Sequence, residues 1–230
     1  MAATLVTTQP TTSTTRPKGD VRLSEIISAL SYALDLTEGQ PLGHSVQSCV
    51  LGMKIAEDLE LSLHEREELY YSLLLKDAGC SSNASRLYRM LGSDERQAKR
   101  DVKTSDWTKV SWDSLQYLKR NVKPGKPPYE RLVTIFQMAL TRDEQSKIII
   151  QTRCERGAKI AQKMGFPEKT SEAIYALDEH WNGKGYPNRL RGEDIPLYAR
   201  IMNLAQTLEV YIALHGPERA VEMEIGRAHV

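Results

Sequence analysis

Residues 181–187, with the sequence Trp-Asn-Gly-Lys-Gly-Tyr-Pro, form the segment whose residue types are best suited to approach a ligand. Glycine tolerates positive φ and lets the backbone come close to a bound group, so Gly183 and Gly185 would let backbone N–H groups approach an anion. Lys184 would place a positive charge over that anion, and the proline that follows Tyr186 restricts its conformation. The pattern predicts a tight, ligand-capable loop, although a plain turn between two helices would also fit it.

A series of amphipathic helices is expected to position this loop. From residue 21 onward, apolar residues recur at three- and four-residue steps, which is typical of helices packed against a core. The stripe of the first helix, which should end at the breaker 38–41, is Leu23, Ile26, Ile27, Leu30 and Leu34. Ser62 and Glu65 have the spacing of a capping box and predict that another helix begins there. Further helices are expected at residues 46–59, 86–91, 111–121, 128–141, 144–164, 167–181 and 197–214. No stretch alternates for long like a strand, so the predicted fold class is all-α, a helical bundle.

The chain is expected to contain one helical domain with an appendage at each end. Residues 1–19 are rich in threonine and nearly free of large apolar side chains, so they are expected to form a disordered leader. The helical domain is assigned to residues 20–223. Residues 224–230 resemble the in-frame translation of a sequencing-library adapter, which indicates a non-native tail on a C-terminally truncated domain. An ordinary frayed terminus is the alternative.

The composition argues against several kinds of partner and site. The chain has 230 residues, 40% of them hydrophobic and 27% charged, and its 31 basic and 30 acidic residues leave a formal net charge of +1. This balance gives no electrostatic reason to expect DNA or a polybasic membrane anchor as a partner. No apolar stretch approaches the roughly 20 residues of a membrane span, and no secretory signal is evident, so a cytoplasmic location is expected. Cys49, Cys80 and Cys154 form no CxxC pair and are expected to be reduced thiols.

Together with its surroundings, the loop resembles the HD-GYP family, a branch of the HD-domain phosphohydrolase superfamily associated with bacterial cyclic-di-GMP signalling. The resemblance covers residues 22–221. It rests on Gly43-His44-Ser45, on residues 73–79 (Leu-Leu-Leu-Lys-Asp-Ala-Gly), on Gly157-Ala158-Lys159-Ile160, and on the loop followed by Ile195-Pro196 and Ala199-Arg200-Ile201. The resemblance implies an HD-domain-like helical bundle with a GYP loop. It also implies a binuclear or trinuclear iron or manganese site that hydrolyses a phosphodiester.

Most of the metal ligands that the resemblance implies are replaced in this chain. His44 and Asp77 match two of the expected ligands. The replaced positions carry Lys76, Arg153, Leu177 and Asp178 instead of histidines, Gln206 instead of an aspartate, and Cys80 instead of a lysine. Protonated lysine has no lone pair to donate and arginine stays protonated in proteins, so Lys76 and Arg153 both oppose the binding of a metal cation. No metal cofactor is therefore expected, and His44 and Asp77 are residual family ligands only.

The two cations suggest another use for the site. Lys76 and Arg153 fall on the apolar faces of their expected helices and should point inward, where a charge needs a partner. Lys76 could pair with Asp77 or Asp178, and the planar guanidinium of Arg153 suits a phosphate or a carboxylate. Two interpretations stay open: an internal salt-bridge cluster that replaces the metal as a stabilising element, or an anion-binding pocket that includes residues 183–186.

These features favour a bacterial signalling or regulatory domain that binds a phosphate-bearing ligand, such as a cyclic dinucleotide, or a signalling protein partner without hydrolysis. The alternative is a metal-dependent phosphodiesterase of cyclic-di-GMP or a related phosphoester, which the intact loop favours and the replaced ligands oppose. A purely structural domain is a third possibility. The sequence therefore leaves open whether the chain is an enzyme.

Overall fold

The computed structural model describes residues 21–38, 40, 42–80 and 127–228, and all the regular structure within them is helical. This confirms the predicted all-α class. The elements are α1 (Leu23–Glu38), α2 (His44–Asp58), α3 (Leu63–Leu75), α7 (Pro128–Lys163), α8 (Glu168–Tyr175), the short 3-10 helix η2 (Gly192–Asp194), α9 (Leu197–His215) and α10 (Pro217–Ala228). None of the described helices has the length and apolar character needed to cross a bilayer. The leader expected at residues 1–19 and the helices expected at 86–91 and 111–121 lie outside the described residues.

Polar side chains fix where α2 and α3 begin. At α3 the predicted capping box is formed, because the Ser62 hydroxyl accepts the Glu65 N–H (3.4 Å) and the Glu65 carboxylate accepts the Ser62 N–H (2.9 Å). α2 begins differently, since Gly43 at its N-cap (φ 86°) has no side chain to accept a hydrogen bond. The buried carboxylate of Asp35 takes that role by accepting the Ser45 N–H at 3.3 Å. This bond ties α1 to the start of α2 and satisfies one of its free N–H groups.

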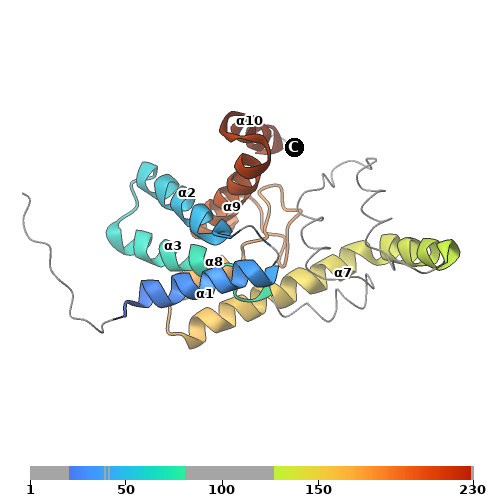
Figure 1. Ribbon diagram of the computed structural model, residues 1–230, viewed down its shortest axis with the longest axis horizontal. Coiled ribbons are helices and arrows are strands. Elements are labelled where there is room, and N and C mark those ends of the chain that lie inside the picture. Colours follow the sequence, from blue (N-terminus) through green and yellow to red (C-terminus); the bar gives the residue numbers. More distant parts are fainter. Residues whose placement is uncertain (1–20, 39, 41, 81–126, 229–230) are drawn as a thin grey trace, which may run out of the picture.

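The core lies between α2, α3, α8 and α9, and α1 packs on α2 and α3 (Figure 1). α7 packs along α8, and α10 packs against α9. The amino-terminal part of α7 extends beyond the other described helices (Figure 1). The largest apolar side chains of the core are almost fully buried: Ile27, Leu69, Leu73, Leu74, Leu75, Ile174, Leu177 and Met202. Burial of each such side chain stabilises the fold by about 1.5–3 kcal/mol before the entropy of ordering is counted.

The boundaries of three helices differ from the sequence-based prediction. Residues 128–163 form one helix of 36 residues, where two helices with a break near residue 142 were predicted. No glycine or proline lies between residues 129 and 156, so nothing in the backbone ends the helix there. The helix predicted at 167–181 ends at Tyr175. α10 was not predicted, and it includes residues 224–228 of the segment expected to be a non-native tail.

The buried face of α1 also differs from the prediction. Ile27 is buried as expected, but Leu23 and Ile26 are 49% and 54% exposed, and the polar residues Ser31 and Asp35 are buried instead. α1 is apolar around much of its circumference, so periodicity alone does not select the face that packs. The hydrogen bond from α2 to Asp35 turns the Ile27 face toward the core.

Candidate functional site

A close backbone contact between the end of α3 and the middle of α7 creates the candidate site. A Cβ added at Gly79 would collide with the backbone of α7 at Arg153 and Gly157, so only glycine permits this approach. Gly157 is constrained as well, because a Cβ added there would lie 2.8 Å from the Ile174 side chain of α8. These two glycines therefore bring the segment 76–80 against α7.

Four charged side chains meet at this contact in two ion pairs. The Lys76 ammonium pairs with the Asp77 carboxylate, and the Arg153 guanidinium pairs with the carboxylate of Asp178, in the turn after α8. The side chains of Lys76 and Asp77 are 0% and 4% exposed, whereas those of Arg153 and Asp178 are 21% and 17% exposed. One pair is thus sealed inside the fold, and the other borders solvent. Each cation needs its carboxylate, because a buried charge without a partner is strongly destabilising.

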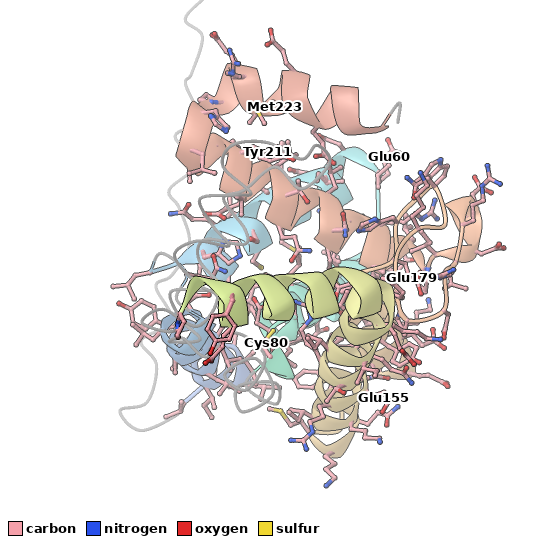
Figure 2. All side chains as sticks on the ribbon, turned by 90° about the vertical axis from the view of Figure 1, so that its right-hand side faces the viewer. Glu60, Cys80, Glu155, Glu179, Tyr211 and Met223 are labelled. Carbon is pink, nitrogen blue, oxygen red and sulfur yellow. The ribbon has the colours of Figure 1, made fainter. Side chains whose placement is uncertain are left out.

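Two thiols join the ion pairs into one group. The Cys80 sulfur lies 3.5 Å from Asp77 Oδ1 and 3.8 Å from the Arg153 guanidinium, and the Cys154 sulfur lies 3.5 Å from Asp178 Oδ2. Figure 2 labels Cys80, which these contacts place against α7. We call this group the ion-pair cluster; its members are Lys76, Asp77, Cys80, Arg153, Cys154 and Asp178.

The cluster keeps its arginine charged and at least one of its thiols neutral. Burial acts to lower the pKa of Arg153, but nearby acids, Asp178 foremost, outweigh burial, and the pKa is raised well above its usual value. Burial raises the pKa of Cys154 to about 12, and the negative charge of Asp178 acts in the same direction. Cys154 is therefore a neutral thiol at physiological pH and has little nucleophilic or metal-binding character.

His44, expected as a residual metal ligand, has a different carboxylate as its partner. Its Nδ1 contacts the Glu209 carboxylate of α9, and both side chains are buried. Glu209 was not predicted from the sequence, because 165 residues separate it from His44. The available signal was the position of Glu209 on the same face of α9 as Met202 and Ala205. Asp77, the other expected ligand, is engaged within the ion-pair cluster.

The donor set of the cluster does not fit the metal site that the family resemblance implies. Iron and manganese are held by neutral imidazoles and carboxylates, whereas Lys76 and Arg153 place two cations beside the available carboxylates. Nowhere in the described part of the chain do three His, Cys, Asp or Glu side chains group in a way that could hold a metal ion. The carboxylates of Asp77 and Asp178, which are those the cluster could offer to a metal, are already engaged by cations of the protein.

The loop that follows α8 is held by Glu179, a buried carboxylate that the sequence analysis did not single out. One of its oxygens accepts the N–H of Asn188 (2.6 Å), and the other accepts the N–H of Leu190 (2.9 Å). Figure 2 labels Glu179 in the coil that joins α8 to α9. No periodicity marks this residue, because it lies outside any helix and its partners are backbone groups.

Three backbone N–H groups of the loop expected to approach an anion donate hydrogen bonds within the protein. Gly183, Lys184 and Tyr186 donate theirs to oxygens of residues 178–182, at 2.8, 3.0 and 3.1 Å respectively. These three N–H groups are therefore engaged within the protein in this structure. Gly185 has a packing role instead, since a Cβ there would collide with the backbone of residues 178–180. The Lys184 side chain is exposed.

The predicted site residues thus fall into two adjoining parts. Lys76, Arg153 and Asp178 lie together in the ion-pair cluster, and residues 183–186 lie next to the cluster through the hydrogen bond from Tyr186 to the Asp178 carbonyl. Because the Arg153–Asp178 pair borders solvent, a phosphate could replace the carboxylate as the partner of the guanidinium. The sealed Lys76–Asp77 pair offers no such exchange.

Comparison with known proteins identifies relatives of this chain. Residues 130–226 match a family model described as an HD domain. The chain is 40% identical over 208 residues to 3'3'-cGAMP-specific phosphodiesterase 3 of Vibrio cholerae serotype O1, a match that covers 90% of this chain and 45% of the relative. It is 36% identical over 69 residues to 3'3'-cGAMP-specific phosphodiesterase 2 of the same organism, covering 29% of this chain and 13% of the relative.

A solved structure agrees with these matches. The crystal structure of a cyclic GMP-AMP-specific phosphodiesterase of V. cholerae matches with a TM-score of 0.65 and 37% sequence identity. The match covers 89% of this chain and 44% of that one. This chain therefore spans less than half the length of the relatives it matches.

Proposed function

We propose that this chain, which belongs to the HD-domain superfamily, is part of a phosphodiesterase of cyclic dinucleotides of the 3'3'-cGAMP class. The observation that carries the proposal is the 40% identity to a 3'3'-cGAMP-specific phosphodiesterase across 90% of the chain. The relatives thus favour the phosphodiesterase alternative over the non-hydrolytic interpretation of the sequence. They are named for 3'3'-cGAMP rather than for the expected cyclic-di-GMP, so 3'3'-cGAMP is the first substrate to test.

A second candidate concerns the role of this particular site within such an enzyme. The ion pairs of Lys76 with Asp77 and of Arg153 with Asp178 favour a site that binds the dinucleotide without cleaving it. The chain matches only 45% of the relative, so hydrolysis by the full-length protein and binding at this site are compatible. A cytoplasmic location and a signalling protein partner stay predictions.

The test combines binding and turnover on the same preparation of this chain. We expect titration calorimetry to show binding of 3'3'-cGAMP that weakens with added salt, because exposed charges are screened. Binding should be lost in Arg153→Gln and kept in Lys54→Gln, which removes a positive charge from the exposed surface of α2. Chromatography after incubation with Mn²⁺ or Fe²⁺ then reports whether a linear dinucleotide is formed.

Each outcome has a defined meaning. Hydrolysis by this chain supports a phosphodiesterase with its catalytic site in this domain. Binding without a product supports a binding role within a larger phosphodiesterase. Absence of both binding and turnover with 3'3'-cGAMP and cyclic-di-GMP contradicts the proposed function.

A further inference from the structure

Trp181, the first residue of the loop, exposes 57% of its surface. A single exposed apolar side chain is ordinary on a protein and needs no explanation. Trp181 differs because hydrogen bonds hold the backbone around it. The Trp181 carbonyl accepts the Gly192 N–H at 3.0 Å, and the carbonyl of the preceding residue, His180, accepts the Gly183 N–H at 2.8 Å. The indole is therefore held at the surface by an ordered backbone.

Arg200 of α9 lies over the indole ring. Its Cζ is 5.8 Å from the ring centroid, within the range of a cation–π interaction. Its Nε is buried and has no hydrogen-bond partner among the described residues. A buried donor without an acceptor is costly, so this guanidinium depends on its contact with the indole for a favourable interaction. The Arg200 guanidinium thus lies against the Trp181 indole, which remains partly exposed to solvent.

The loop that carries this ring also carries three basic side chains. Lys184, Arg189 and Arg191 are all exposed, and the Arg189 guanidinium lies 5.6 Å from the ring of Tyr186. Trp181 follows Asp178 by three residues, and three residues span at most about 11 Å. The Cα atoms of Trp181 and Asp178 therefore lie within about 11 Å of each other, a separation that one dinucleotide can span.

We infer that Trp181 and Arg200 form a stacking platform for one nucleobase of a cyclic dinucleotide whose phosphate is bound by Arg153. The inference rests on the proposed function and adds the residues that contact the base. Every base has a π face, and stacking on an aromatic side chain is a general mode of nucleotide binding. Arg200 supports the ring through its cation–π contact, and the exposed basic side chains of the loop attract the phosphates.

The experiment measures binding of two probes to the whole chain by titration calorimetry. The first probe is 3'3'-cGAMP, and the second is ribose 5-phosphate, which carries a phosphate but no base. We expect Trp181→Leu to weaken 3'3'-cGAMP binding roughly 5- to 100-fold and to leave ribose 5-phosphate binding unchanged. Trp181→Tyr, which keeps an aromatic face, should restore most of the affinity. Tyr129→Leu is the matched control, because it removes another exposed aromatic ring (67% exposed) from the start of α7.

The possible results separate the platform from the function on which it rests. Equal 3'3'-cGAMP affinities for the wild-type chain and Trp181→Leu overturn the platform and leave the proposed function standing. The platform is also overturned if Trp181→Leu weakens both probes equally, because the loss then does not depend on the base. Absence of binding and of turnover of both 3'3'-cGAMP and cyclic-di-GMP by the wild-type chain overturns the platform and the proposed function together. Circular dichroism melts of each variant exclude loss of folding as the cause of weaker binding.

Discussion

Gly79, after the end of α3, lies so close to Gly157 on α7 that a Cβ added at position 79 would be 2.6 Å from the Gly157 nitrogen. Both contacting groups are backbone, so neither can move aside as a flexible side chain could. We expect Gly79→Ala to lower the free energy of unfolding by about 3 kcal/mol, the upper range for overpacking. Urea denaturation at neutral pH measures the change.

Gly165→Ala is the control for this prediction. Gly165 has a positive φ of 82° but open space around it, so its substitution should cost only about 1 kcal/mol of backbone strain. Equal losses of unfolding free energy in the two variants would show that the backbone contact between Gly79 and α7 is looser than in this structure.

Because the Lys76–Asp77 ion pair is sealed inside the fold, substitution of Asp77 alone should destabilise the domain more than substitution of both residues. Asp77→Ala leaves the ammonium of Lys76, whose side chain is 0% exposed, without its carboxylate. The expected loss is about 3–5 kcal/mol of unfolding free energy. The double variant Lys76→Met/Asp77→Ala removes the unpaired charge and should recover at least half of that loss. A double variant less stable than Asp77→Ala would show that Lys76 has another stabilising partner.

Treatment with a chelator is expected to leave the stability of the domain unchanged, because the cations of Lys76 and Arg153 already engage the carboxylates that would bind a metal. A chelator should shift the melting temperature by less than about 1 °C, since a ligand that is not bound contributes no stability. Elemental analysis of protein purified without chelator provides the second measurement. About one iron or manganese ion per chain, together with a lower melting temperature after chelation, would contradict the prediction.

Local sequence patterns predicted those features of the fold that depend on neighbouring residues. Helical periodicity located α1, α2, α3 and α9, and the Ser62–Glu65 spacing predicted the capping box. The inward direction of Lys76 and Arg153 also followed from periodicity, since both lie on apolar helix faces. The continuity of α7 was missed because a polar stretch near residue 142 resembles a connection, although helix-compatible residues fill it.

The remaining features depend on contacts between distant residues, which local patterns do not encode. Glu209 and His44 meet across 165 residues, and Glu179 binds backbone groups of the loop rather than another side chain. The burial of Asp35 was not predicted, because the apolar residues of α1 suggested that another face of this helix is buried. The internal acceptors of three loop N–H groups were not predicted either, because the position of a hydrogen-bond acceptor cannot be predicted from glycine spacing alone.

Two buried thiols predict how the stability of the domain depends on alkaline pH. Burial raises the pKa of Cys49 and of Cys154 from 9.0 to about 12 in the folded chain. Above pH 9 the unfolded chain loses these protons first, so the unfolded state is favoured as the pH rises toward 12. The two thiols together should lower the free energy of unfolding by about 3 kcal/mol between pH 8 and pH 10. Urea denaturation of the wild-type chain and of Cys49→Ala/Cys154→Ala at both pH values measures this contribution. Tyrosines titrate in the same range in both proteins, so the difference between their pH slopes isolates the thiols, and equal slopes would contradict the prediction.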